Sequence, residues 1–209
     1  GMFVSGEMPS SYEYCDEMKR EFSSDCIAIV RQLGVHPCIL AWVLFNESWG
    51  IPSVKSDREC QQFVESVKDA VRAADPSRLI VINDGWHQLD GDLLTLHEYE
   101  QNADMLSREY ADKQYVVRDK IVNQNRWGRS FADNYSYAGQ SILISEFGGV
   151  SLAHDGGWGY GDKAEGLEEY GRRVSGLVTA LHGIGYLSGI CYTQFTDVQQ
   201  ETNGLVTID

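Results

Sequence analysis

Two long apolar runs, residues 36–48 and 141–149, constrain the fold of this 209-residue chain more than any other feature. Both are almost continuously apolar, without the strict alternation of apolar and polar residues that marks a strand with one solvated face. Continuous runs of this kind are typical of strands that helices cover on both faces, as in parallel sheets. The sequence therefore predicts an α/β protein with a buried parallel sheet.

Strand-like and helix-like segments alternate along the chain. We predict six strands, at residues 2–4, 36–48, 79–83, 93–97, 141–146 and 189–192. We predict four helices, at about 10–33, 57–74, 104–122 and 163–181. Ser10 or Ser11 is the expected N-cap of the first helix and Asp57 that of the second. The alternation favours βαβ units with right-handed crossovers.

Six strands are two fewer than the eight that close a (β/α)8 barrel. Two interpretations follow from the pattern alone. The fold is either an open doubly wound sheet or most of a barrel whose opening strands lie upstream of residue 1. Both place the chain in the α/β class as a single domain over residues 1–209, a length that can bury a sizeable core.

Composition excludes several classes of partner. The formal net charge is −14, from 31 acidic and 17 basic residues, and such a field repels the phosphates of nucleic acid. No run approaches the roughly 20 apolar residues that a membrane span needs, and no signal peptide is visible. We therefore expect neither a nucleic acid nor a membrane partner. A cytoplasmic location is the corresponding expectation, although an excised domain carries no targeting information.

Glu47 and Glu146 follow the two apolar runs, and each opens onto a loop that contains glycine. Open and closed parallel α/β sheets bind ligands at the carboxyl ends of their strands. Two carboxylates at this edge predict an enzyme that works with a carboxylate pair. The alternative for either residue is a solvated strand end without a role in catalysis.

Three segments resemble glycoside hydrolase family 2, which includes β-galactosidases, β-glucuronidases and β-mannosidases. Residues 36–48 (HPCILAWVLFNES) are similar to the family segment that runs from a His-Pro pair to Asn-Glu-Ser. Residues 144–148 (ISEFG) resemble its Ile-Thr-Glu-Tyr-Gly segment. Residues 192–198, followed by Glu201, residues 203–205 and Asp209, resemble its eighth strand and exit region. The likeness covers nearly the whole chain. It implies a truncated (β/α)8 TIM barrel, from about the third strand to the eighth, without the first two strands and the last helix.

The resemblance also implies roles for individual residues. Glu47 takes the position of the acid/base and Glu146 that of the nucleophile in a retaining β-glycosidase, whose two carboxyl groups lie about 5 to 5.5 Å apart. Asn46 matches the residue that hydrogen-bonds the sugar 2-hydroxyl. His97 and Tyr99 match sixth-strand positions in the pocket, where a tyrosine hydroxyl would hydrogen-bond the nucleophile. The implied partner is an oligosaccharide or glycoside, with no metal or organic cofactor.

Aromatic residues in loops are further candidates for substrate contact, because aromatic faces can stack on sugar rings. Trp49 is the first of these, and Trp86, Trp127 and Trp158 also lie in or near loops, where each can equally serve packing. The eighth strand departs from the family, since many members carry a tryptophan there. This chain has Tyr192, Thr193 and Gln194, and we expect Gln194 to contact the substrate.

Two other readings remain open. One is a carbohydrate-binding or structural barrel module in which Glu47 and Glu146 persist without turnover. The other is a metal-dependent barrel hydrolase that uses Asp84, His87, His97 and Glu98, although no clear ligand motif supports it. An open barrel exposes unpaired strand edges, which can leave an isolated fragment inactive or make it form homo-oligomers through those edges.

Overall fold

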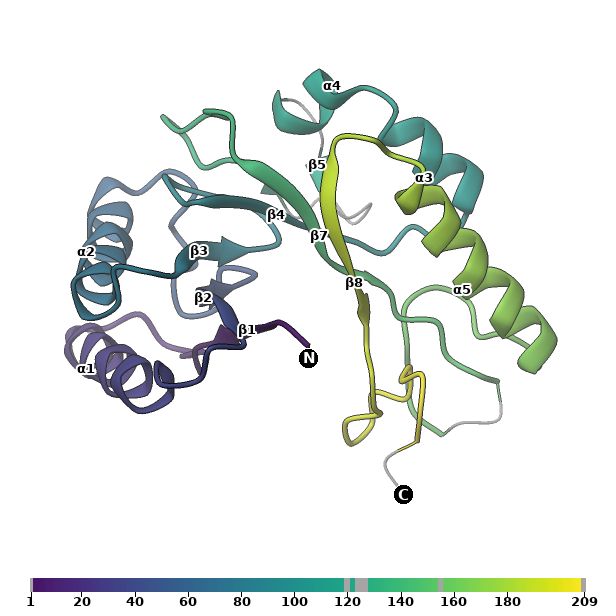
Figure 1. The fold of residues 1–209 in the computed structure, drawn as a ribbon, viewed down its shortest axis with the longest axis horizontal. Helices are drawn as coiled ribbons and strands as arrows, with labels where there is room; N and C mark the ends of the chain where they lie inside the picture. The colour runs from purple at the N-terminus through teal and green to yellow at the C-terminus, as the bar shows by residue number, and fades with distance from the viewer. Residues whose placement is uncertain (1, 119–120, 123–127, 154–155, 208–209) are drawn as a thin grey trace. The chain divides into compact units, whose positions relative to one another are not determined.

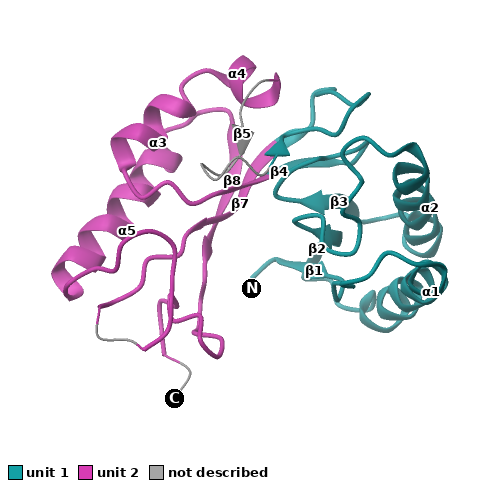
Figure 2. Cartoon of the chain, turned by 180° about the vertical axis from the view of Figure 1, so that it is seen from behind, with its two compact units in different colours: residues 1–95, 128–141 teal, residues 96–127, 142–209 magenta. Residues whose placement is uncertain are grey.

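The computed structural model describes residues 2–118, 121–122, 128–153 and 156–207 (Figure 1). The chain divides into two compact units, coloured separately in Figure 2. Unit 1 comprises residues 1–95 and 128–141, and unit 2 comprises residues 96–127 and 142–209. Trp127, one of the predicted sugar-stacking residues, lies outside the described residues.

Unit 1 contains a parallel three-stranded sheet covered by two helices (Figure 1). Its elements are β1 (Val4–Glu7), α1 (Asp16–Leu33), β2 (Ile39–Asn46), α2 (Arg58–Ala74) and β3 (Leu79–Asp84). The sheet order β1-β2-β3 follows the sequence, as expected when each helix connects two neighbouring parallel strands. Residues 41–45 of β2 are all buried, which explains why this segment reads as a continuous apolar run.

The two helices of unit 1 pack against each other and the sheet through apolar stripes of helical period. The buried positions are Met18, Phe22, Cys26 and Val30 on α1, and Cys60, Val64, Val67 and Val71 on α2. Asp57 caps α2 as predicted and accepts hydrogen bonds from two backbone amides of its first turn. The predicted cap of α1 is wrong, because Ser11 bonds within its own loop and Cys15 is the N-cap instead.

A polar cluster lies beside the amino-terminal half of β2. Asp75 accepts hydrogen bonds from the Trp42 indole at 3.0 Å and from Arg78 at 2.7 Å, and it also binds Ser77. Burial alone would raise the pKa of Asp75, but these donors outweigh it and hold that pKa below its ordinary range. The cluster fixes the α2–β3 connection, and Arg78 continues it by donating to the carbonyl of Ile39.

The strand order β4-β7-β8 lies mostly in unit 2, and its strands β7 and β8 are parallel. The elements that follow β3 in the chain are β4 (Leu93–Glu98), α3 (Ala103–Glu109), α4 (Lys113–Arg118), β5 (Ile121–Val122), β6 (Gly128–Arg129), β7 (Ser141–Gly148), α5 (Leu167–His182) and β8 (Leu187–Thr193). The helices α3 and α5 pack against each other. Strand β8 is at the edge of its sheet and is only partly buried.

The single helix predicted at residues 104–122 is wrong, because the chain breaks into α3 and α4 after Glu109. Tyr110 leaves the helical conformation, and its buried hydroxyl donates to Glu98 at 3.3 Å. Its carbonyl accepts a hydrogen bond from the Tyr186 hydroxyl at 2.8 Å. Asp112 then starts α4 by accepting from the amide of Gln114. These partners are distant in sequence, so the local pattern did not reveal the break.

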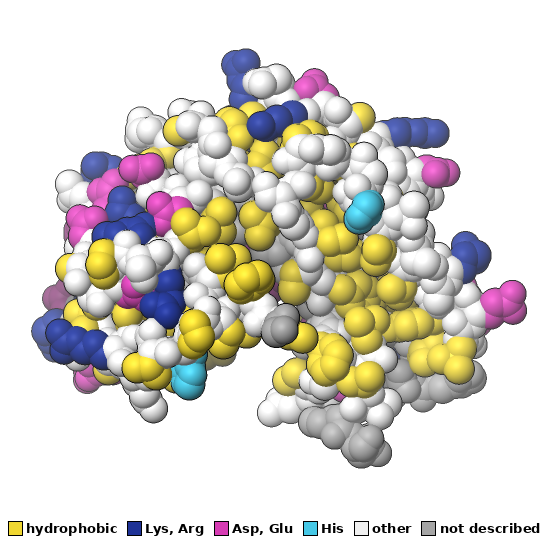
Figure 3. All heavy atoms as spheres, viewed as in Figure 1, with side chains coloured by type: hydrophobic (Ala, Val, Ile, Leu, Met, Phe, Trp, Pro, Cys, Tyr) yellow, Lys and Arg dark blue, Asp and Glu magenta, His cyan; other side chains and the backbone are white. Residues whose placement is uncertain are grey.

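The mixed α/β class with parallel sheets is confirmed, since each of the six predicted strands and the remaining predicted helices is present with shifted ends. The two largest sheets of the described residues are small, with three strands each. None of the helices in the described part of the chain combines the length and apolar character needed to cross a membrane. Figure 3 shows hydrophobic side chains at the surface, and the exposed ones include Phe3 and Val4 at the edge strand β1.

Candidate active site

In unit 1, the chain turns sharply where β2 ends. Glu47 and Ser48 both adopt left-handed backbone conformations, with φ of 50° and 63°. Non-glycine residues rarely take this conformation and need surrounding contacts to hold it. The amide of Glu47 donates to the carbonyl of Asp84 at 2.9 Å, and the amide of Ser48 donates to Asn83 Oδ1 at 3.0 Å. The turn therefore fixes the position of Glu47 from the neighbouring strand β3.

Two predicted binding residues flank Glu47. Asn46 is the last residue of β2, and its Oδ1 atom is buried without a hydrogen-bond partner among the described residues. A buried acceptor without a donor is costly, and a ligand hydroxyl would satisfy it. Trp49 is 51% exposed, and its ring lies edge-to-face with Tyr12 at a centroid distance of 5.7 Å. Trp86, by contrast, is buried at 6% exposure.

His87 supports the same turn from the loop after β3. Its Nδ1 atom lies 3.4 Å from Ser48 Oγ, and Gly128 packs so closely on the other side that a Cβ there would lie 2.5 Å from Nε2. Burial lowers the pKa of His87 to about 4, and the positive charge of Lys55 acts in the same direction. His87 is therefore neutral at physiological pH and acts as a structural hydrogen-bonding group.

The lowered pKa of His87 makes stability depend on pH. The unfolded chain binds a proton near pH 6.5, whereas the folded chain does not until about pH 4. The unfolded state binds more protons in this window, so the free energy of unfolding falls as pH drops through it, by up to about 3 kcal/mol. In His87→Asn, which tolerates the left-handed backbone, this loss should largely disappear. Denaturant titrations of both proteins at neutral pH and near pH 4 measure the change in the free energy of unfolding.

The control is His36→Asn, which makes the same substitution at an exposed histidine. An equal loss of stability in the wild type and His87→Asn would contradict the assignment.

In unit 2, Glu146 lies on β7 beside two residues from β4 and its continuation. His97 Nδ1 is 3.4 Å from Glu146 Oε2, and the Tyr99 hydroxyl donates to the same oxygen. His97 is fully buried and Tyr99 is 7% exposed, while Thr193 Oγ1 lies 3.4 Å from the tyrosine hydroxyl. The structure thus brings three predicted site residues of unit 2 together: Glu146, His97 and Tyr99.

An irregularity in β7 positions Glu146. The register of β7 on β8 shifts between Ile144 and Phe147, across the two residues Ser145 and Glu146. Such bulges re-aim side chains and are frequent next to functional sites. Beyond the bulge, Gly148 has a φ of 88°, and a Cβ there would lie 2.3 Å from the Tyr192 ring. Only glycine therefore fits at position 148, where β7 ends.

A stacked pair of tyrosines holds the donor to Glu146. The rings of Tyr99 and Tyr160 are parallel within 4° at a centroid distance of 3.4 Å, and Trp158 packs edge-on against Tyr160. Burial, and then the charge of Glu146, raises the pKa of Tyr99 well above its ordinary range. Tyr99 therefore keeps its proton and remains a donor. Tyr160 was not predicted, since only its place in the glycine-rich loop 148–161 hinted at a role.

Gln194 is engaged within its own segment. Its Nε2 donates to Asn203 Oδ1 at 2.9 Å, and Asn203 is 1% exposed and donates in turn to Glu201 at 3.1 Å. The amide group of Gln194 thus ties β8 to the turn that follows. Contact between Gln194 and a substrate stays a prediction.

The four residues of the metal alternative do not form one cluster within either unit. Asp84 and His87 belong to unit 1, whereas His97 and Glu98 belong to unit 2. His97 and Glu98 are adjacent in β4, so their side chains point to opposite faces of the sheet. His97 contacts Glu146, and Glu98 accepts from Tyr110. A shared metal ion on this neighbouring pair would require one side chain to change face.

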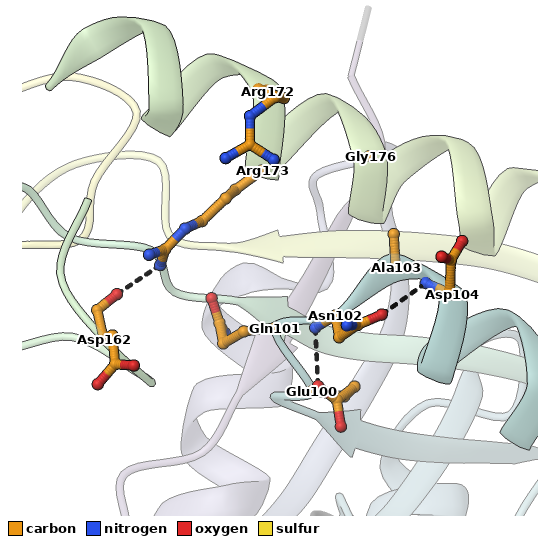
Figure 4. A pocket seen from close by; sticks show the side chains of 9 residues that line it. All are labelled: Glu100, Gln101, Asn102, Ala103, Asp104, Asp162, Arg172, Arg173 and Gly176. Carbon is orange, nitrogen blue, oxygen red and sulfur yellow. Dashed lines mark hydrogen bonds between the residues drawn. The ribbon is translucent and has the colours of Figure 1, made fainter. Parts of the chain in front are cut away.

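A separate cavity of about 560 Å³ lies in unit 2 between residues 100–104 and α5 (Figure 4). Charged residues of both signs line it, including Asp104 and Arg172. Arg173 reaches across it to the carbonyl of Asp162, as the dashed line in Figure 4 shows. None of the predicted site residues lines this cavity, so we assign it no part in the site around Glu146.

Comparisons with known proteins identify the fold. No protein-family model matches the sequence, and no curated protein matches it either. Solved structures of glycosidases do match. A β-glucuronidase from Bacteroides uniformis has a TM-score of 0.68 at 15% identity, covering 99% of this chain and 26% of that one.

Two further matches give the same picture. A β-galacturonidase of glycoside hydrolase family 2 from Eisenbergiella tayi has a TM-score of 0.67 at 15% identity, covering 98% of this chain and 38% of that one. A β-glucuronidase from an uncultured Clostridium species has a TM-score of 0.65 at 15% identity, covering 99% and 37%. The chain therefore has a fold related to that of family 2 glycosidases and spans between about a quarter and two fifths of their length.

Proposed function

We propose that this chain is the catalytic region of a retaining β-glycosidase, with Glu146 as the nucleophile and Glu47 as the acid/base. The observation that carries the proposal is the environment of Glu146. One of its oxygens accepts a hydrogen bond from Tyr99 and lies 3.4 Å from His97, on a strand irregularity that aims the side chain. A carboxylate held by a donor that keeps its proton is suited to attack a sugar carbon while ionised.

The proposed architecture is a single (β/α)8 barrel domain over residues 1–209, of which the six strands β1, β2, β3, β4, β7 and β8 supply about the third to the eighth barrel strands. The likeness to family 2 glycosidases over nearly the whole chain supports it. The parallel pairing within both sheets also supports it. In such barrels the reactive side chains come from the carboxyl ends of the strands, where Glu47 and Glu146 are placed in their own sheets.

The proposed reaction has two steps. In the first, Glu146 bonds to the anomeric carbon while the glycosidic bond breaks, and Glu47 gives its proton to the departing oxygen. In the second, Glu47 takes a proton from water, the water oxygen bonds to the anomeric carbon, and Glu146 is released. This scheme requires the two carboxyl groups to lie about 5 to 5.5 Å apart. No cofactor takes part in it.

Asn46 is the proposed contact for the sugar 2-hydroxyl. Its buried Oδ1, which has no donor among the described residues, would be satisfied by that hydroxyl. His97, Tyr99, Trp49 and Gln194 complete the proposed substrate contacts. The substrate is an oligosaccharide or glycoside, and β-glucuronides and β-galacturonides enter the test because the structural neighbours are named for them. A cytoplasmic location and homo-oligomers formed through open sheet edges remain predictions.

A substrate panel tests the proposal. The full-length protein is assayed against aryl β-glycosides of neutral and acidic sugars, and the accepted sugar is then supplied as a mechanism-based fluorosugar. We expect turnover of one series and a covalent adduct on the peptide that contains Glu146, identified by mass spectrometry. Sugar binding without turnover of any β-glycoside would favour the non-catalytic binding module instead. Turnover that a chelator abolishes would favour the metal alternative.

Removing the donor to Glu146 should weaken catalysis without abolishing it. In Tyr99→Phe we expect kcat/KM to fall roughly 10- to 100-fold, because a hydrogen bond to a charged group contributes about 1.5 to 3 kcal/mol. The Tyr99 hydroxyl stabilises the ionised form of Glu146, so its removal should move the acidic limb of the pH profile to higher pH. Kinetics across the pH range measure both effects.

Tyr115→Phe is the matched control, because Tyr115 is an exposed tyrosine on α4. A Tyr99→Phe profile with an unchanged acidic limb would show that Tyr99 serves packing alone.

A further inference from the structure

An exposed aromatic pair adjoins the turn that carries Glu47. Tyr12 is 81% exposed and Trp49 is 51% exposed, although both rings are large and apolar. Their centroids lie 5.7 Å apart with an interplanar angle of 71°, so the two exposed rings form a corner. Contiguous exposed aromatic surface of this kind marks an interaction site more often than scattered single residues do.

The backbone holds this corner in place. The amide of Trp49 donates to the carbonyl of Asn46 at 2.9 Å, which closes the turn around Glu47. Gly50 has a φ of 75°, and a Cβ there would lie 2.8 Å from the carbonyl oxygen of Ser11. The loop that carries Tyr12 therefore packs directly on the loop that carries Trp49. This close approach requires glycine and holds the two loops together.

The position of Trp49 decides which part of a substrate the corner can meet. Glu47, two residues earlier, is the proposed donor of the proton to the departing oxygen, and Trp49 closes the same turn, so the corner adjoins the residue that would meet the leaving group. The faces of a pyranose ring carry C–H groups that pack against aromatic rings, whereas its edges carry hydroxyls that stay solvated. A corner of two exposed rings suits such an occupant.

The acidic residues around Tyr12 indicate which charge the leaving group can carry. A cavity of about 490 Å³ adjoins Tyr12 and is lined by four acidic residues, Glu13, Glu17, Glu21 and Asp25, and by no lysine or arginine of the described chain. Carboxylates repel an anionic group and accept hydrogen bonds from hydroxyls. A neutral sugar therefore fits these acidic surroundings better than a uronic acid or a sulfated sugar.

We propose that Tyr12 and Trp49 form a leaving-group subsite that binds a neutral pyranose ring, so that the natural substrate is a disaccharide or longer oligosaccharide. This inference rests on the proposed function. Its test compares three substrates that share the accepted sugar: the glycosyl fluoride, a disaccharide with a neutral leaving sugar, and one with a uronic acid leaving sugar. The leaving group of the glycosyl fluoride has no ring to stack on Tyr12 or Trp49, so the rate for this substrate measures the chemical step without that contact.

In Tyr12→Ala the ratio of kcat/KM for the neutral disaccharide to that for the fluoride should fall about tenfold, the factor that corresponds to one aromatic contact. Trp49→Ala should lower the same ratio. Tyr12→Phe keeps the ring and should restore most of it. The exposed Tyr115, remote from this turn in the sequence, provides the control Tyr115→Ala with an unchanged ratio. The wild type should prefer the neutral disaccharide to the uronic one, and added salt should reduce that preference.

An unchanged ratio in both alanine variants overturns the subsite. If both rates fall by the same factor, the unchanged ratio indicates a structural role. Equal turnover of the two disaccharides at low salt removes the neutral-sugar assignment. A wild type that converts no glycosyl fluoride instead refutes the proposed function, and the subsite falls with it.

Discussion

Glu146→Ala should lower kcat for every accepted β-glycoside by roughly 10⁴-fold or more, because the covalent intermediate can no longer form. Sodium azide should restore part of the activity, since azide can occupy the space that the carboxylate leaves. The attack then comes from the face opposite the departing group, in one displacement rather than two. The product should be a glycosyl azide of inverted configuration, which proton NMR identifies from the anomeric coupling.

Two controls separate loss of chemistry from loss of structure. Glu146→Gln keeps the size of the side chain and should be as inactive as the alanine variant while its unfolding free energy stays close to that of the wild type. Glu168→Ala removes an exposed acid from the first turn of α5 and should retain full activity. Azide products of retained configuration from Glu146→Ala would sink the assignment of Glu146 as the nucleophile.

Much of the local structure is accessible from the sequence because it depends on short-range signals. The apolar run before Asn46 predicts β2, and its end places Glu47 at the carboxyl terminus of a strand. Asp57 marks the start of α2, and the Asp75-Pro76 pair marks its end. Each of these signals acts within a few residues, so the local sequence is enough to predict it.

The finer features of the site depend on residues that are distant in sequence. The left-handed conformation at Ser48 is held by Asn83, which is 35 positions away. The stack of Tyr160 on Tyr99 and the shift of register at Glu146 likewise depend on packing between separate segments. A sequence pattern gives the position of a strand end but not the direction in which its last side chains point. The family resemblance supplied the expected contact between Tyr99 and Glu146, which composition and spacing alone did not contain.

Glu47→Ala should produce a loss that depends on the leaving group. For substrates whose leaving group needs a proton, kcat/KM should fall by roughly 10²- to 10⁴-fold, the usual contribution of general acid catalysis. For a dinitrophenyl glycoside, whose leaving group departs without a proton, bond cleavage should proceed and the second step should become limiting.

Azide distinguishes Glu47 from Glu146 by the product that it gives. In Glu47→Ala the covalent intermediate on Glu146 still forms, so azide attacks it in a second displacement and should yield a glycosyl azide of retained configuration. Glu59→Ala is the control, since Glu59 is an exposed acid on α2 whose pair with Lys19 lies at the surface. An inverted azide from Glu47→Ala would exchange the two roles. Equal losses for dinitrophenyl and alkyl glycosides would instead show that Glu47 does not donate the proton, because a proton donor must affect the poorer leaving group more.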